Sequence, residues 1–299
     1  MTDFSKVKIR CSALGLINTG PRGKSNLEKY NDAVLLIKEE QEKYDAISNK
    51  ELKSAITKAD KIARLKAELV EIEAVKNDIQ LSETCKSYLV QTYILEKYGR
   101  VKDITTKEMK KGVLVEDDSI SLLNAFDNAD YKKNTERLSN DFIIGTPDII
   151  NGDEVIDIKS SWDIFTFLSN IQEPINDIYY AQLQGYMALT GAKIGTVSYC
   201  LTDTPDSIIE GEKYSLLRNM DVLTEEDPAY KKEVEKLMRN RQFNDIKLSE
   251  RILTFSINRD DDYIEKTYRK VERCRLFLEE FEQKHLSFSK HNRKNTYIV

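Results

Sequence analysis

The stretch GTPDIINGDEVIDIKSSW, Gly145–Trp162, sets two aspartates and a lysine among isoleucines and valines. Asn151 and Gly152 lie between two β-branched runs, and Asn-Gly in that setting favours a β-hairpin with a two-residue type I′ turn. The stretch therefore predicts two paired antiparallel strands that carry charges where a half-buried hairpin normally carries apolar residues.

The expected pairing decides where these charges point. With the turn at Asn151-Gly152, Asp148 lies opposite Val155, and side chains alternate between the two faces along each strand. Asp148, Asp157 and Lys159 then share one face of the hairpin. The two carboxylates become diagonal neighbours, roughly 7 Å apart, which is close enough for a metal ion to draw them together.

The composition bounds the class of protein. The chain has 299 residues, of which 40% are hydrophobic and 32% charged, as in ordinary soluble globular proteins. It contains no apolar run of membrane length, and its first residues lack the apolar core of a signal peptide. We expect a cytoplasmic protein without a membrane partner.

Cysteine and histidine usage excludes several site types. The four cysteines are widely spaced without a CxxC pair, which argues against a zinc ribbon, an iron–sulfur cluster or a disulfide framework. Only two histidines occur, and both are near the C-terminus, so a histidine-rich zinc centre or a Ser-His-Asp triad is not expected. These residues are Cys11, Cys85, Cys200, Cys274, His285 and His291.

The charge distribution is uneven. The net charge of −5 gives no overall basic footprint for nucleic acid. From Arg269 onward, however, eight Lys or Arg stand against four Glu. This segment is interpreted either as a solvated helix face with a tail or as a patch that contacts phosphates.

The pattern along the chain predicts an α/β (α+β) fold in a single domain, residues 1–299. Up to about Asn26 we expect a short extended entry, and residues 27–81 have the apolar spacing of a long helical arm rich in Lys and Glu. Ser82 and Gly99 are suited to cap the next helix. Residues 107–201 alternate helix, strand, strand, helix and strand, and a polar loop region follows. Residues 252–299 predict a strand at 252–257 and a long C-terminal helix.

Two polar residues interrupt apolar helical stripes. Glu116 completes the stripe of one helix, and because an uncompensated buried carboxylate is costly it needs a cation or a proton. A salt bridge to Lys or Arg is the alternative interpretation. Gln182 occupies a stripe of a second helix, where a glutamine more often bonds a backbone carbonyl. The stripe around Glu116 consists of Met109, Val113, Ile120 and Leu123, and the stripe around Gln182 consists of Ile178, Tyr186 and Leu189.

The order of these features resembles the PD-(D/E)xK nuclease superfamily, and within it the phage-type exonucleases similar to lambda exonuclease and the YqaJ-like recombinases. The matching motifs are GxxxE at Gly112–Glu116, PD at Pro147-Asp148, DIK at Asp157–Lys159, YYAQLQGYM at Tyr179–Met187, and RCSALGLI around Ser12. The stretch from about Leu27 to Ser82 does not align with the family. The resemblance implies a restriction-endonuclease-like core, a central mixed β-sheet flanked by helices, with a long helical insertion.

The resemblance also implies residue roles. Glu116, Asp148, Asp157 and the Ile158 carbonyl would hold Mg²⁺, with Mn²⁺ as a substitute, because such hard ions prefer oxygen ligands. Lys159 would activate the attacking water if its pKa is lowered, or otherwise balance charge at the transition state. Gln182 would hold Lys159, the water or the scissile phosphate. The expected DNA contacts are Arg10 and Ser12 at the terminal phosphate, with Tyr179 and Tyr186 nearby.

The implied function is a metal-dependent exonuclease of the phage recombination type, which degrades linear duplex DNA from its 5′ ends. A single-strand annealing protein as partner and a trimeric ring are expected by analogy only. Two alternatives stay open: a structure-selective or restriction-type endonuclease on the same core, and a non-catalytic DNA-binding or assembly protein that uses its charged helices for contacts.

Overall fold

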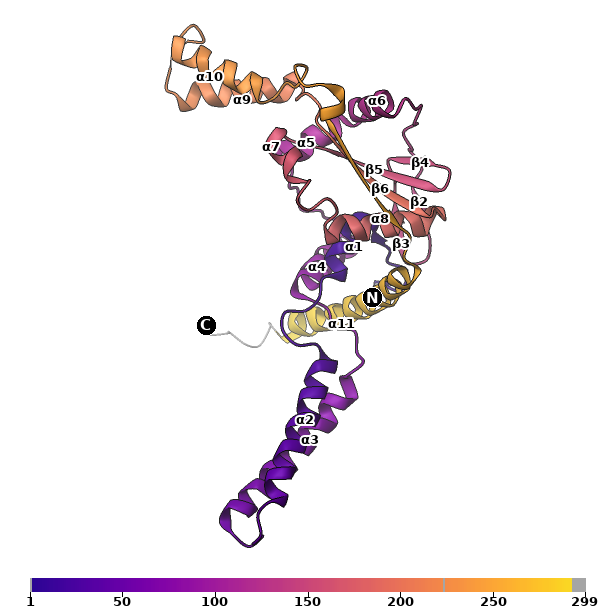
Figure 1. Ribbon diagram of the computed structural model, residues 1–299, viewed down its shortest axis with the longest axis vertical. Coiled ribbons are helices and arrows are strands. Elements are labelled where there is room, and N and C mark those ends of the chain that lie inside the picture. The colour runs from indigo at the N-terminus through magenta and orange to yellow at the C-terminus, as the bar shows by residue number, and fades with distance from the viewer. Residues whose placement is uncertain (1, 223, 292–299) are drawn as a thin grey trace. The chain divides into compact units, whose positions relative to one another are not determined.

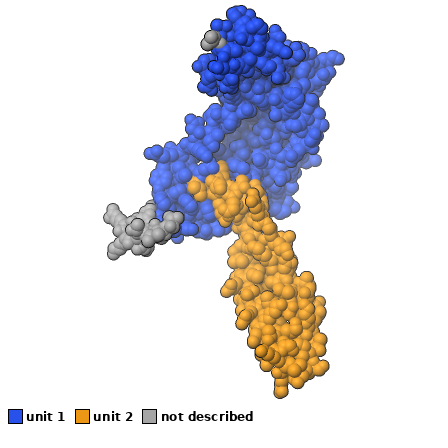
Figure 2. Space-filling model, turned by 90° about the vertical axis from the view of Figure 1, so that its left-hand side faces the viewer, with its two compact units in different colours: residues 1–18, 91–299 blue, residues 19–90 orange. Residues whose placement is uncertain are grey.

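The computed structural model describes residues 2–222 and 224–291. The chain forms two compact units (Figure 2). The first unit contains the described residues up to Asn18 and from Gln91 onward, and the second is Thr19–Val90. Within the described residues, no helix is both long and apolar enough to cross a membrane.

The second unit is built around two helices, α2 (Asn26–Asp45) and α3 (Lys53–Val75). Ser25 caps α2 in a capping box with Glu28. Glu40 of α2 is buried and accepts ion pairs from Lys43, Lys58 and Lys61 at 3.2–3.5 Å. The pairing of Glu40 with lysines from both helices joins α2 to α3.

Helix α4 (Glu83–Tyr98) begins and ends where its capping residues predict. The Ser82 hydroxyl accepts a hydrogen bond from the Cys85 amide at 3.1 Å, so Ser82 is the N-terminal cap. Gly99 follows the last turn with φ +61°, a left-handed conformation that favours glycine, and its amide donates to the Leu95 carbonyl.

The first unit contains two mixed sheets (Figure 1). The smaller has the order β1-β3-β2, with β1 parallel to β3. The larger has the order β4-β5-β6-β7, in which only the central β5–β6 pair is parallel. The strands are β1 (Ile9–Arg10), β2 (Leu138–Ser139), β3 (Ile143–Gly145), β4 (Ile149–Asn151), β5 (Glu154–Ser160), β6 (Ile194–Cys200) and β7 (Ile252–Asn258).

Helices cover both faces of the larger sheet. Ile156 and Ile158 of β5 pack with Ile120 and Leu123 of α6 in one buried cluster. Helix α8 packs against β5 and β6, and the intervening residue Asp157 points toward it. The helices are η1 (Cys11–Ala13), α1 (Leu14–Asn18), α5 (Lys107–Leu114), α6 (Glu116–Asp127), α7 (Ile164–Ser169), α8 (Asp177–Thr190), α9 (Asp206–Asn219), α10 (Pro228–Arg239), η2 (Leu248–Glu250) and α11 (Asp261–His291).

The predicted hairpin is present as β4 and β5, but its register differs. Asn151 pairs with Glu154, so the turn residues are Gly152 and Asp153. Gly152 has φ +59° at the first central position, which is the conformation that a type II′ turn requires there. Continuing this register places Asp148 opposite Asp157 instead of Val155. The shift moves the pairing by two positions, so each side chain keeps its predicted face.

Three element predictions were wrong. The expected single helix from Lys107 to Leu123 is broken at Val115, whose φ and ψ of −108° and 16° separate α5 from α6. The region after residue 201, which was expected to be a polar loop, contains the amphipathic helices α9 and α10. Most residues of these two helices are polar, and few are buried. The entry expected to be extended contains η1 and α1. The strand at residues 252–257 and the C-terminal helix are present as β7 and α11.

Candidate active site

Asp157 is the most buried carboxylate on the predicted charged face. Its side chain projects from the middle of β5 and is 3% exposed. Oδ1 accepts a hydrogen bond from Gln182 Nε2 at 2.9 Å, and Oδ2 lies 2.6 Å from Lys159 Nζ. A buried carboxylate without such partners would be strongly disfavoured, so these two contacts explain how Asp157 is kept at this depth.

Lys159 lies two residues further along the same strand and on the same face. Its side chain is 26% exposed, and Nζ lies 5.0 Å from the centre of the Tyr179 ring. Burial disfavours the ammonium, but the charges of Asp157 and Asp148 outweigh burial and raise the pKa of Lys159. A raised pKa keeps the Lys159 ammonium protonated, as charge balance requires, whereas proton abstraction requires a lowered pKa.

Asp148 completes the pair of carboxylates. Its Oδ2 accepts a hydrogen bond from the Ile158 amide at 2.7 Å, so the side chain continues the hairpin ladder beyond the last backbone pair. Burial, followed by the nearby charge of Asp157, raises the pKa of Asp148 to about 7. Two carboxylates that repel one another in a half-buried site are a place where a cation would be stabilising.

Gln182 and Tyr186 support Asp157 from α8. Both side chains are buried, and Gln182 Nε2 donates to the Tyr186 hydroxyl at 2.9 Å as well as to Asp157. Gln182 therefore contacts Asp157 and not Lys159. It also does not bond a backbone carbonyl, which is the role that Gln184 has with Asn258. Burial, followed by the charge of Asp157, raises the pKa of Tyr186, so its hydroxyl stays neutral.

Glu116 differs most from expectation. It is the first residue of α6, its side chain is 29% exposed, and it lies 3.4 Å from Lys133 Nζ. Only half of the stripe that it was expected to complete is buried: Ile120 and Leu123 are in the core, whereas Met109 and Val113 are 56% and 75% exposed. Because the helix breaks at Val115, α5 and α6 are separate helices and their residues do not form one continuous stripe. In this structure Glu116 forms an ion pair with Lys133, which was the alternative interpretation.

The oxygen donors at this site fit a hard divalent cation in kind, but they are not gathered into one cluster. Among the described residues, no group of three or more His, Cys, Asp or Glu side chains is placed to hold a metal ion. Asp148 and Asp157 are on one sheet face, whereas α6, which carries Glu116, packs on the other. The Ile158 carbonyl points to the same side of β5 as its amide, toward Asp148.

Arg10 and Ser12 lie at the end of β1, which pairs with the strand that precedes Asp148 in the chain. The parallel strands β1 and β3 end side by side, and η1 with Ser12 follows β1 as Asp148 follows β3. Both Arg10 and Ser12 are exposed. Cys11, between them, is buried and packs closely against Gly145. If Gly145 carried a Cβ atom, that atom would lie 2.8 Å from Cys11 Sγ. This close packing fixes the backbone that carries Ser12.

Three arginines of the predicted basic segment make internal contacts. Arg269 and Arg273 of α11 pair with Glu265 and Glu280 at 2.6 and 3.3 Å. Arg275 donates to backbone carbonyls of the first unit. The side chain of Lys290, and Arg293 and Lys294, lie outside the described residues.

Sequence reasoning missed the contacts that hold the end of β5. Ser119 of α6 and Ser160 share a hydrogen bond of 2.8 Å between their hydroxyls. Lys111 of α5 is fully buried and donates to the carbonyls of Ser161 and Trp162 at 2.8 and 3.1 Å. Nothing in the run KEMKKGVL distinguishes Lys111 from the exposed Lys110 beside it.

Comparison with known proteins identifies the fold. No protein-family model and no curated protein matches the chain. A phage-related exonuclease from Haemophilus somnus 129PT has a TM-score of 0.61 and 22% identity, over 94% of this chain and 97% of that chain. The alkaline exonuclease LHK-Exo from Laribacter hongkongensis has a TM-score of 0.47 and 15% identity, over 71% and 89%. Its complex with dAMP gives a TM-score of 0.47 and 16% identity, over 72% and 89%.

The first of these likenesses spans nearly both whole chains. The chain therefore has the mixed α/β fold of a phage-related exonuclease, which confirms the fold that the motif order implies.

Proposed function

We propose that this protein is a metal-dependent deoxyribonuclease that degrades linear duplex DNA from its 5′ ends. The observation that carries the proposal is the arrangement of Asp148, Asp157 and Lys159 on one sheet face, with Lys159 Nζ 2.6 Å from Asp157. The fold shared with a phage-related exonuclease supports it.

Asp148, Asp157 and the Ile158 carbonyl would hold Mg²⁺ or Mn²⁺, and Glu116 would join them after leaving Lys133. When bound, such an ion supplies Lewis-acid stabilisation of the phosphoryl oxygens and lowers the pKa of a coordinated water. These hard ions take oxygen ligands, and the donors present are all oxygens.

The chain's own side chains have separate tasks in this proposal. Lys159, charged and near the surface of the site, stabilises the negative charge that develops on the scissile phosphate. Gln182 fixes the orientation of Asp157 through Oδ1, and the neutral Tyr186 hydroxyl fixes Gln182. The ring of Tyr179 supports the Lys159 ammonium from one side.

Exposed Arg10 and Ser12 are proposed to bind a 5′-terminal phosphate. An arginine and a hydroxyl are strong partners for a phosphate. Arg10 ends β1 and Ser12 follows it, and β1 pairs with β3, the strand that precedes Asp148 in the chain. A recombination role with a single-strand annealing partner, and assembly into a homo-oligomer, belong to the same proposal. Light scattering of the purified protein tests the oligomer.

The test is digestion of end-labelled linear duplex and covalently closed circular DNA in Mg²⁺, with EDTA as control. The proposal predicts loss of label from linear DNA only, and no activity in EDTA. Rapid linearisation of circles would favour a structure-selective or restriction-type endonuclease. No cleavage of any DNA in Mg²⁺ or Mn²⁺ would favour a binding or assembly protein.

A further inference from the structure

A buried lysine outside the candidate site holds the backbone that directly follows Lys159. Lys111 is fully buried on α5, and its ammonium donates to two consecutive carbonyls, those of Ser161 and Trp162. These residues form the turn in which β5 ends, two and three positions after Lys159. The contacts of Lys111 therefore reach the strand that carries Asp157 and Lys159.

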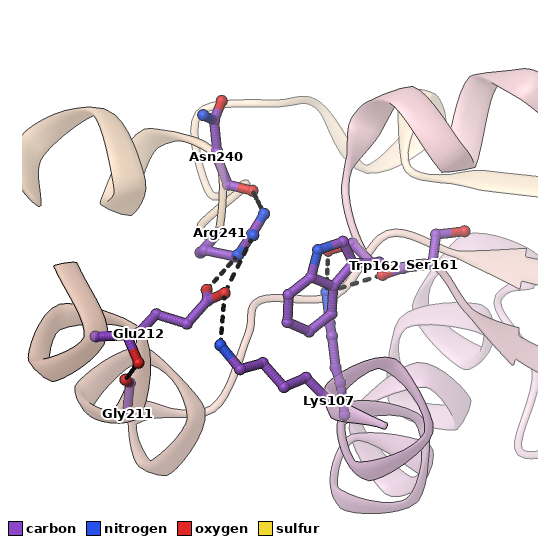
Figure 3. A network of polar contacts seen from close by, with 9 residues as sticks. Lys107, Ser161, Trp162, Gly211, Glu212, Asn240 and Arg241 are labelled. Atoms are coloured by element: carbon purple, nitrogen blue, oxygen red, sulfur yellow. Dashed lines mark hydrogen bonds and ion pairs between the residues drawn. The ribbon is translucent and has the colours of Figure 1, made fainter. Parts of the chain in front are cut away.

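The same turn is held from its other sides. The Ser161 amide donates to the Cys200 carbonyl of β6 at 2.9 Å. The guanidinium of Arg241 lies 4.3 Å from the centre of the Trp162 ring, and Glu212 of α9 accepts from Arg241 Nε at 2.8 Å. Figure 3 shows Arg241 between Glu212 and Trp162. Lys111 thus supplies one side of a turn that is fixed by several independent contacts.

Stability alone does not account for a lysine at this position. A buried ammonium loses its hydration, and apolar side chains of similar size often replace buried charges without loss of stability. Lys111 Nζ also lies 5.4 Å from the centre of the Phe243 ring, so one side of its surroundings is apolar. Burial, followed by the charge of Arg241, lowers the pKa of Lys111 to about 8, in line with that cost.

Lys111 also connects the turn to the helix that begins with Glu116. Its backbone carbonyl accepts the Val115 amide at 3.0 Å, the hydrogen bond that closes α5 at the break before α6. One residue is therefore bonded through its side chain to the end of β5 and through its backbone to the start of α6.

We infer that Lys111 is a positioning residue for the proposed nuclease reaction, which fixes the end of β5 and thereby the placement of Lys159. The inference rests on the proposed function. It predicts that removal of the Lys111 ammonium lowers kcat while the protein still folds. The reason is that a displacement of about 1 Å at reacting groups costs roughly 100-fold in rate.

The experiment compares Lys111→Met with the matched control Lys110→Met, an exposed lysine on the same helix. DNA hydrolysis in Mg²⁺ gives kcat and KM, and thermal unfolding gives Tm. Trp162 is the only tryptophan in the chain, so its fluorescence emission and acrylamide quenching report directly on the turn. Lys111→Arg keeps a cation that can donate to both carbonyls and serves as the rescue variant.

We expect Lys111→Met to shift the Trp162 emission, to lower kcat by about 100-fold and to leave the KM for DNA unchanged. Lys110→Met should match the wild type, and Lys111→Arg should recover most of the lost rate. Should Lys111→Met not fold, Lys111→Gln keeps an N–H donor without charge and should show the same direction of change.

Two results would overturn the inference. A shifted Trp162 emission with kcat near the wild-type value would mean that the turn does not place Lys159. A lower Tm with unchanged kcat would mean that Lys111 serves only stability. Wild-type protein that cleaves no DNA would instead overturn the proposed function, and with it this inference.

Discussion

Lys159 Nζ lies 2.6 Å from Asp157 Oδ2, although the two side chains leave the same strand two residues apart. Period-two alternation puts both on the face that α8 covers, where Gln182 takes the other oxygen of Asp157. The lysine partly neutralises a pair of carboxylates. The two aspartates differ in their partners. Asp157 is paired with a cation, whereas Asp148 accepts a hydrogen bond from the Ile158 amide.

Asp148→Asn should therefore stabilise the metal-free protein at high pH. The pKa of Asp148 is raised from 3.8 to about 7, so its stabilising contribution is complete below 3.8 and is lost as the pH rises through 7. The difference between these two pKa values is worth at most about 4 kcal/mol of stability, at about 1.4 kcal/mol for each pH unit. Asn keeps an acceptor for the Ile158 amide. Thermal unfolding in EDTA from pH 5 to 9 should give a Tm difference that grows with pH, and a constant difference would contradict the assignment.

Glu116 should change partners when a metal is added. Crystals soaked in Mn²⁺ should show anomalous density roughly 2.0 to 2.6 Å from carboxylate oxygens of Asp148, Asp157 and Glu116. Lys133 should then be released from Glu116. Density bound by the two aspartates, with Glu116 still 3.4 Å from Lys133, would limit Glu116 to a structural ion pair.

Ser12→Ala should reduce the preference for 5′-phosphorylated ends. Ser12 is exposed just after β1, and loss of its hydroxyl would remove one proposed hydrogen bond to a terminal phosphate, worth about 1.5–3 kcal/mol for a charged group. The ratio of initial rates on duplexes with 5′ phosphate and 5′ hydroxyl measures the effect. An unchanged ratio, with Ser12→Ala as active as the wild type, would remove Ser12 from the site.

Two glycines in helices should respond oppositely to alanine. A Cβ at Gly185 of α8 would lie 2.6 Å from Leu14 and 3.0 Å from Cys11 Sγ, so Gly185→Ala should cost about 1–3 kcal/mol by overpacking. Gly211 of α9 has no neighbour within 4 Å of such a Cβ, and Gly211→Ala should gain up to about 1 kcal/mol of helix propensity. Urea unfolding of both variants measures the difference. Equal effects would contradict the close packing of η1 on α8.

The hairpin shows how far the sequence determines the candidate site. Alternation assigned Asp148, Asp157 and Lys159 to one face, and that face survives a register shift of two positions. The predicted register placed the turn at Asn151 and Gly152. The observed turn lies one residue later, at Gly152 and Asp153, and Gly152 with its positive φ is the first of the two turn residues.

The remaining differences arise from tertiary contacts. Gly112 lies inside α5, and no glycine or proline stands at Val115, where the helix breaks. The exposure of Glu116 therefore could not be predicted from its spacing. Lys111 is buried while Lys110 is exposed, and only the position of the β5 turn distinguishes them. Residues 206–239 are polar enough to suggest a loop, but their helical faces pack against one another.

The most direct test of the account is hydrolysis of a 5′-phosphorylated linear duplex in Mg²⁺ by the wild type and by Asp157→Asn. Asn can still accept the hydrogen bond from Gln182, so the fold should persist by circular dichroism. The charge that would hold the metal and pair with Lys159 is lost. We predict that the wild type degrades the duplex and that Asp157→Asn is slower by at least about 100-fold. A folded Asp157→Asn that retains most of the wild-type rate would contradict the assignment of this site.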